Sequence, residues 1–156
     1  MKKKLWLFAK VVSLYVGIFL FVRFVLVPIL ETYIAPPAGT NLEDYLDRLV
    51  LLSIVGFIIS ALASCVWEWR ALYFRYTKEE LMSSRYRFWW WLLFFVCCVV
   101  SYACFEILRR PNEGAAYITL FLFGITIGPY YIATLFFSPS GAKYVPPFPR
   151  LIRHWK

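Results

Sequence analysis

The chain contains very little of the chemistry from which catalytic or metal-binding sites are built. It has one histidine, His154, and two methionines, of which only Met82 follows the first residue. No serine, histidine and acid form a catalytic set, no carboxylates are paired within an apolar run, and no phosphate loop or metal-ligand cluster is present. The sequence therefore predicts a protein that is not an enzyme and that holds no metal or other cofactor.

Long hydrophilic stretches are also missing. The chain has 156 residues, and the polar segments between its apolar runs are too short to form a soluble domain. Apolar residue types make up 62% of the chain and aromatic types 21%, whereas soluble domains contain about 45–50% apolar residues. A soluble fold of this size cannot bury so much apolar surface, but a bilayer can. We therefore expect a single transmembrane domain over residues 1–156.

Disulfide and redox motifs are absent as well. The four cysteines, Cys65, Cys97, Cys98 and Cys104, all lie within apolar runs. Their spacing matches neither a CxxC motif nor a cysteine–histidine metal site. Because a free cysteine behaves as a small apolar residue, we expect all four to be reduced and packed between helices.

Four apolar runs are long enough to cross a bilayer, which takes about 20 mostly apolar residues. They cover residues 5–30, 49–67, 88–108 and 115–137, and they leave a polar loop at 68–87 and a tail at 138–156. Three lysines at the start resemble a signal peptide, but the first run is far longer than the ~7–15 apolar residues of such a peptide. We therefore expect it to be retained as the first span.

Lysine and arginine are distributed unequally between the two sides that these spans define. One side carries thirteen of them: Lys2, Lys3, Lys4, Lys10, Arg70, Arg75, Lys78, Arg85, Arg87, Lys143, Arg150, Arg153 and Lys156. The other side carries three: Arg48, Arg109 and Arg110. Basic residues in short loops stay in the cytoplasm, so this pattern predicts that both termini are cytoplasmic.

Tryptophan placement indicates the same cytoplasmic side. Six tryptophans fall at the predicted cytoplasmic ends of the first three spans, and one lies in the tail: Trp6, Trp67, Trp69, Trp89, Trp90, Trp91 and Trp155. An indole favours the headgroup level, where its ring faces lipid and its N–H faces water. The predicted fold is thus an all-α membrane protein, a four-helix antiparallel bundle with N-in/C-in topology and an extended basic C-terminal tail.

Two capping boxes refine the helix boundaries. Thr40-Asn41-Leu42-Glu43 follows a proline- and glycine-containing turn at 36–39 and predicts that the second helix starts near Asn41. Thr77-Lys78-Glu79-Glu80 predicts a short helix that leads into the third span.

Arg23 is the only charged residue between Val11 and Leu30, within the first span. An arginine near the bilayer centre costs about 2.5–3.5 kcal/mol on insertion scales, so it needs compensation. Glu106 is the only acid within a predicted span, and both residues fall in the outer half of the membrane. We expect an intramembrane ion pair between Arg23 and Glu106. The alternatives are that each side chain extends to the outer headgroups or that both line a substrate pathway.

Small residues recur at helical spacing in three spans and indicate helix packing. They are Ser53, Gly56, Ser60 and Ser64 in the second span, Cys97, Ser101 and Cys104 in the third, and Gly124 and Gly128 in the fourth. Small side chains let helix backbones approach closely in lipid. These residues pack the bundle itself or form a docking face for another membrane subunit.

Prolines predict two helix kinks and an extended tail. Pro28 and Pro129 each remove a hydrogen bond to the carbonyl four residues earlier. The segment 144–150 contains three prolines and favours an extended chain. The residues after it are basic and apolar, which is typical of a segment that lies on the inner membrane surface.

The function classes that remain are non-enzymatic. The first is an accessory or structural subunit of a larger membrane complex, such as a secretion, conjugation or energy-transducing assembly. The alternatives are an immunity-type protein that blocks a toxin in the membrane, and an oligomeric small transporter or channel. Similarity to immunity proteins is one of topology alone.

The predicted partners follow from the charge pattern. The net charge is +8, and the basic residues flank apolar runs, so anionic lipid headgroups on the cytoplasmic side fit better than nucleic acid. Other membrane subunits or further copies of the chain are the expected protein partners. The lysine-rich start favours a bacterial inner membrane.

Overall fold

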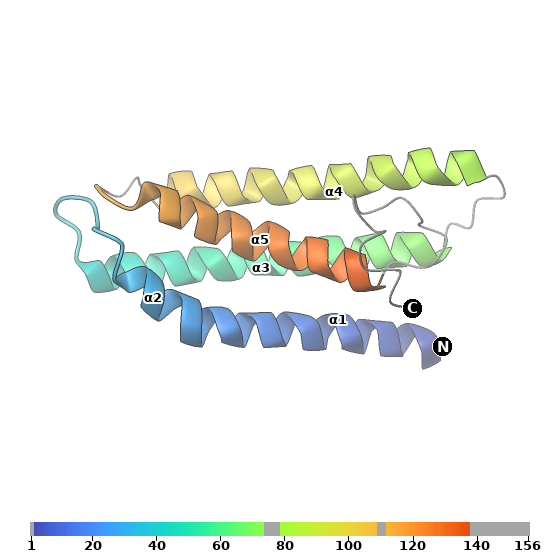
Figure 1. Cartoon of the computed structure of the whole chain (residues 1–156), viewed down its shortest axis with the longest axis horizontal. Helices are drawn as coiled ribbons and strands as arrows, with labels where there is room; N and C mark the ends of the chain where they lie inside the picture. The colour runs from blue at the N-terminus through green and yellow to red at the C-terminus, as the bar shows by residue number, and fades with distance from the viewer. Residues whose placement is uncertain (1, 74–78, 109–111, 138–156) are drawn as a thin grey trace.

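The fold was determined as a computed structural model that describes residues 2–73, 79–108 and 112–137. Side chains are described for 9–70, 87–108 and 112–136. The elements in these ranges are all helical: α1 (Lys2–Phe21), η1 (Val22–Leu26), α2 (Val27–Glu31), α3 (Leu42–Tyr73), α4 (Glu79–Ile107) and α5 (Ala115–Phe137). The long helices lie side by side along the longest axis of the molecule (Figure 1).

Four helical segments are long and apolar enough to cross a membrane. They are Ala9–Glu31, Leu42–Arg70, Arg87–Ile107 and Ala115–Phe136. These segments correspond to the four predicted spans, and they indicate an integral, multi-pass membrane protein. All four cysteines are free thiols, and Cys97 and Cys104 are buried between helices.

The predicted loop 68–87 is largely helical. α3 has 32 residues, which corresponds to about 48 Å at 1.5 Å per residue and exceeds the ~30 Å hydrocarbon core. It continues to Tyr73, and α4 begins at Glu79 as one uninterrupted helix. The short helix expected before the third span is therefore the first part of α4, and Thr77 of its capping box lies outside the described residues.

The start of α3 lies where the sequence predicts it, but the capping residue differs. The first helical hydrogen bond joins the amide N of Tyr45 to the carbonyl O of Asn41 at 3.1 Å. Asn41 is therefore the N-cap residue, one position after the predicted Thr40. The amide of Thr40 instead closes the preceding turn on the carbonyl O of Pro37, also at 3.1 Å.

The first span contains a π-helical segment directly before Pro28. In η1, the N–H of Val27 bonds to the carbonyl O of Val22, five residues earlier. Pro28 has no N–H to give to the carbonyl of Phe24, and its ring crowds that carbonyl. A local widening of the helix relieves this crowding, so the perturbation predicted at Pro28 takes the form of a π segment. α5, in contrast, continues as a helix through Pro129.

The two connections at one end of the molecule are joined to each other. Ala35 and Glu113 form an isolated antiparallel bridge, and Asn112 Nδ2 donates to the carbonyl O of Pro36 at 3.1 Å. Gly114 adopts a φ of 82°, and a Cβ there would lie 2.6 Å from the carbonyl O of Tyr33. We call this end, which holds residues 32–41 and 112–114, the loop end, and the opposite one the N-terminal end.

α3 and α5 form the centre of the packing. α3 packs closely against α1, α4 and α5, and α5 also packs against α1 and α4. Apolar side chains fill the loop half of the interior, among them Val27, Tyr45, Leu49, Ile118 and Leu122. Aromatic and polar side chains fill the half nearer the N-terminal end, where Trp67, Trp90 and Tyr130 are buried.

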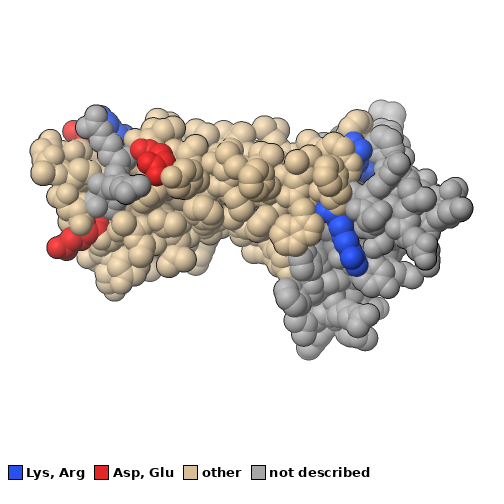
Figure 2. All heavy atoms as spheres, turned by 90° about the horizontal axis from the view of Figure 1, so that it is seen from above, with Lys and Arg blue, Asp and Glu red and all other residues tan. Residues whose placement is uncertain are grey.

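Charged side chains lie at the two ends of the molecule on the face that Figure 2 shows, with an uncharged band between them. Acidic side chains gather toward the loop end, at the left of the view. This distribution matches the division of charge between the two sides in the sequence.

Candidate functional site

A cluster of polar side chains from all four long helices lies in the interior near the N-terminal end. Tyr15 of α1 is its centre, because its hydroxyl O lies 2.8 Å from Ser60 Oγ and 2.7 Å from Ser64 Oγ of α3. Cys97 of α4 and Tyr130 of α5 are buried in the same region of the interior. We call Tyr15, Ser60, Ser64, Cys97 and Tyr130, together with Glu68, the polar cluster.

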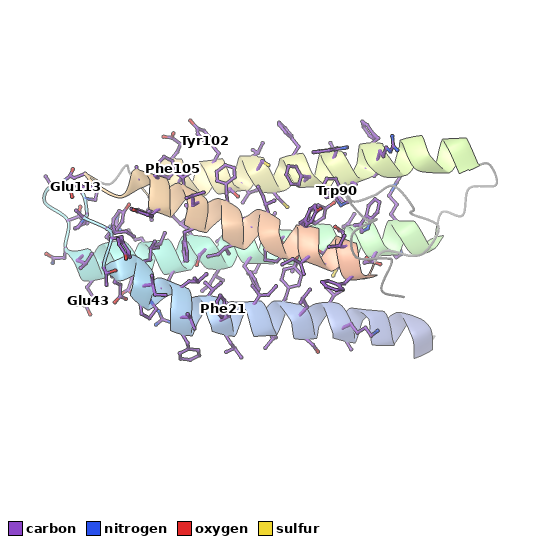
Figure 3. All side chains as sticks on the ribbon, viewed as in Figure 1. Phe21, Glu43, Trp90, Tyr102, Phe105 and Glu113 are labelled. Atoms are coloured by element: carbon purple, nitrogen blue, oxygen red, sulfur yellow. The ribbon has the colours of Figure 1, made fainter. Side chains whose placement is uncertain are left out.

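Hydrogen bonds between α4 and α5 close the cluster on one side. Trp90 Nε1 donates to Thr134 Oγ1 at 3.0 Å, and the Tyr130 hydroxyl donates to the carbonyl O of Trp90 at 3.1 Å. The Trp90 ring also stacks on Phe94, with 5.2 Å between ring centroids. Figure 3 shows Trp90 directed from α4 toward α5 and Tyr102 directed away from the bundle. Trp90 is therefore a core residue that ties α4 to α5.

Glu68 is the unusual member of the cluster. Its side chain is only 3% exposed, and neither carboxylate oxygen has a hydrogen-bond partner. Arg70 follows two positions later on α3, but its guanidinium lies over the Trp89 ring, 3.6 Å from the centroid. A buried carboxylate without a partner is costly, so this position requires a physical explanation.

The predicted small-residue seams of the second and third spans lie inside the bundle. Ser53, Gly56, Ser60, Ser64, Cys97, Ser101 and Cys104 are all buried. At Gly56 the backbone of α3 approaches α5 so closely that an added Cβ would lie 2.5 Å from Thr126 Oγ1. The hydroxyls of Ser53, Ser101 and Thr126 donate to carbonyl groups of their own helices. These side chains thus serve close packing and leave no free hydroxyl donor at those positions.

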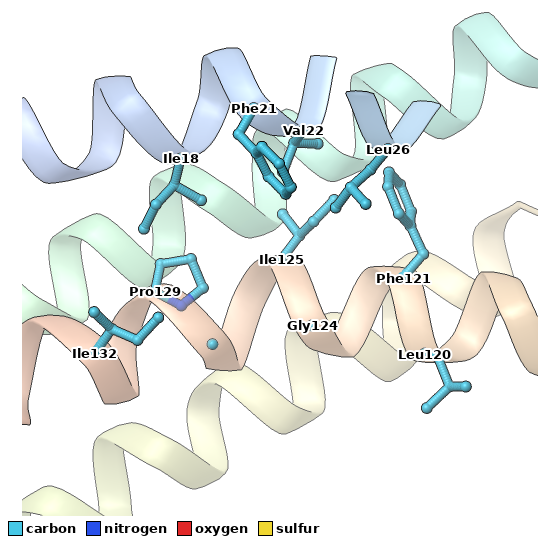
Figure 4. A pocket seen from close by; sticks show the side chains of 11 residues that line it. Ile18, Phe21, Val22, Leu26, Leu120, Phe121, Gly124, Ile125, Pro129 and Ile132 are labelled. Carbon is cyan, nitrogen blue, oxygen red and sulfur yellow. The ribbon is translucent and has the colours of Figure 1, made fainter. Parts of the chain in front are cut away.

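The two glycines of the fourth span are placed differently. A Cβ at Gly124 or Gly128 would meet nothing within 4 Å. Both glycines line an apolar groove of about 340 Å³ between α5 and the first span. In Figure 4, Phe121, Ile125 and Pro129 of α5 point toward the α1–η1 segment across this groove. The glycines of α5 therefore line an open groove and make no close contact with the facing helix.

Arg23 lies on η1 and Glu106 on α4, and both side chains are exposed. α4 packs closely against α3 and α5. The ion pair and its alternatives stay predictions, and the charge-swap double mutant Arg23→Glu/Glu106→Arg is the test that separates them.

The tryptophans predicted at the membrane interface fall into two groups. Trp69 and Trp91 are each 52% exposed, and Trp89 is half-buried. Trp67 and Trp90 are fully buried among other side chains. Trp67 and Trp90 lie near the N-terminal end, as the sequence predicts, but they pack inside the bundle and do not face headgroups. The side chain of Trp6 and the whole of Trp155, with the tail 138–156, lie outside the described residues.

The comparisons with known proteins add no relative. Neither the protein-family models nor the curated proteins nor the solved structures gave a match to this chain. Function is therefore inferred from the chain's own residues.

Sequence reasoning named Ser60, Ser64 and Cys97 as packing residues but missed the polar cluster, because it assigned Glu68 to the loop 68–87 and did not single out Tyr15. One feature of the sequence could have indicated part of the cluster. Ser60, Ser64 and Glu68 are spaced by four residues, so they continue the second-span seam on the same helix face. Groups of three or more histidine, cysteine or acidic residues that could hold a metal ion do not occur in the part of the chain that the structure describes.

Proposed function

We propose that this protein is a non-enzymatic accessory or structural subunit of a larger membrane complex, such as a secretion, conjugation or energy-transducing assembly. It docks a transmembrane helix of another subunit in the groove between α1 and α5. We further propose an antiparallel bundle with both termini cytoplasmic in a bacterial inner membrane.

The uncovered glycines of α5 carry this proposal. Helices associate in lipid where small residues let their backbones approach. Gly56 meets that condition within the bundle, but a Cβ at Gly124 or Gly128 would meet nothing within 4 Å. The groove that they line is apolar and lies along helices that can span a membrane. An apolar helix with a small-residue face would pack more closely in this groove than lipid acyl chains would.

The topology proposal rests on charge and on helix contacts. Tyr15 of α1 contacts Ser64, in the second half of α3, and Trp90, in the first half of α4, contacts Thr134, near the end of α5. These contacts are compatible with neighbouring helices that run in opposite directions. The basic residues that flank the N-terminal end then lie in the cytoplasm.

Gly124→Leu tests the docking face. The new side chain has open space, so we expect the variant to fold with unchanged stability and to lose most of its co-purifying membrane partner at native expression level. Gly17→Leu is the matched control, because a Cβ at Gly17 also meets nothing within 4 Å and Gly17 is not part of the groove lining.

The outcome can contradict the proposal in three ways. Recovery of a lone monomer at native expression would exclude a stable complex. Self-association that Gly124→Leu abolishes would make the occupant a second copy of the chain. Tightly bound lipid without any protein partner would make it an acyl chain.

A further inference from the structure

Glu68 lacks any compensating charge in the part of the chain that the structure describes. Its carboxylate oxygens accept no hydrogen bond. Arg70 is directed toward Trp89, and residues two positions apart on a helix do not face each other. The other titratable groups near Glu68 are Cys65 on its own helix and Tyr130 on α5. Neither of them carries a positive charge.

The described side chains near Glu68 are buried as well. Ser64 and Tyr130 are fully buried, and so is Trp67 next to it in the chain. The Tyr130 hydroxyl already donates its proton to the carbonyl O of Trp90. Burying a charged carboxylate in such a place costs far more free energy than burying a neutral carboxylic acid.

A row of hydroxyl groups continues from Glu68 toward the middle of the bundle. Ser64 lies one helical turn before Glu68, and Ser60 lies one turn before Ser64. Tyr15 bridges the two serines, and in each of its two hydrogen bonds either oxygen can be the donor. The direction of the hydrogen bonds in this row can therefore reverse without any movement of the helices.

We propose that Glu68 is a proton-binding site, continued into the bundle by Ser64, Tyr15 and Ser60. A proton is the ligand that fits, because it neutralises the carboxylate without the space that the coordination shell of a metal or organic cation needs. The titratable groups near it are Cys65 of α3 and Tyr130 of α5. Arg70 follows two positions later on α3 and lies over Trp89, while Tyr15 of α1 and Cys97 of α4 lie near Tyr130. Loss of the proton would place an unpaired charge between α1, α3 and α5, so the N-terminal half of the bundle loosens when Glu68 deprotonates.

Infrared spectroscopy of the full chain in lipid nanodiscs tests the site directly. With glutamate isotopically labelled, we expect the C=O stretch of a protonated carboxylic acid at neutral pH in the wild-type protein. The band should be lost in Glu68→Gln and kept in Glu43→Gln, which changes an exposed carboxylate on the same helix. A wild-type spectrum with carboxylate bands alone at neutral pH would overturn the proposal without the need for any variant.

Thermal unfolding across acidic to alkaline buffers provides a second measurement. The wild-type protein should lose stability as the pH rises, because an ionised Glu68 would be an unpaired buried charge in the folded bundle. Glu68→Gln keeps the shape of the side chain and cannot ionise, so its profile should lack that loss. Identical profiles for the two proteins would contradict the proposal. Both measurements use the isolated protein, so they do not depend on a partner in the α1–α5 groove.

Discussion

Tyr15 illustrates, at the scale of single residues, how a polar group is accommodated between membrane helices. Its ring packs edge-on against Phe57, with 4.9 Å between centroids, and its hydroxyl satisfies Ser60 and Ser64 together. One side chain thus supplies both apolar contact and a hydrogen-bond partner for two buried serines. Such shared partners matter more in lipid than in water, because lipid offers no replacement for a lost hydrogen bond.

Tyr15→Phe should destabilise the protein by about 1–2 kcal/mol, since two buried serine hydroxyls lose their partner while the ring remains. Chemical unfolding of the purified protein in mild detergent measures the change. Tyr33→Phe is the control, because Tyr33 is 56% exposed and outside the cluster. Equal stability of the two variants would show that the serines find other partners.

At the scale of helices, the small residues divide into two functional sets. Gly56 holds α3 against α5, where Thr126 leaves no room for a further methyl group. Gly124 and Gly128 lie on the other side of α5 and leave it uncovered. The same residue type thus closes the bundle on one face and keeps a face open on another, which the spacing alone does not reveal.

Gly56→Ala should cost about 1–3 kcal/mol, because the added methyl group forces α3 and α5 apart or displaces Thr126. Gly128→Ala should change the stability by no more than about 0.5 kcal/mol, as expected for a substitution without a steric conflict. The same unfolding experiment compares the two variants. A cost at Gly128 equal to that at Gly56 would mean that the groove is closed in the folded protein.

At the scale of the whole molecule, the loop end and the N-terminal end differ in construction. The loop end is held by backbone pairing between Ala35 and Glu113 and by the close approach of Gly114 to Tyr33. The N-terminal half is held by aromatic and hydroxyl side chains around Glu68. A change at Glu68 should therefore affect the N-terminal half while the loop end stays assembled.

Cysteine labelling in intact cells checks the orientation. In a background without native cysteines, Glu43→Cys should react with an impermeant thiol reagent from outside, and Arg87→Cys should react only after the membrane is permeabilised. Both positions are exposed, so access depends on sidedness alone. The reverse pattern would contradict the N-in orientation, and equal access of both from one side would contradict the antiparallel bundle.

The helical spans were accessible from the sequence, because length and hydropathy decide whether a segment can cross a bilayer. The candidate site could not be predicted from the sequence. Glu68 directly follows the second predicted span, and a charged residue at that position normally belongs to a loop. Its burial depends on α3 continuing to Tyr73 and on the helices that pack around this part of α3. The ion pair of Arg23 and Glu106 was predicted from depth alone and stays a prediction, because depth does not specify the face of a helix.

By itself, the sequence determined four apolar helices and an unequal distribution of charge between their two sides. Both are local or additive properties of the chain, which is why they could be read without coordinates. The tertiary structure decided which small residues close the bundle and which remain open, and it brought Tyr15, Ser64 and Glu68 together. These outcomes depend on helix rotation and on contacts between residues far apart in the chain, and no single span contains that information.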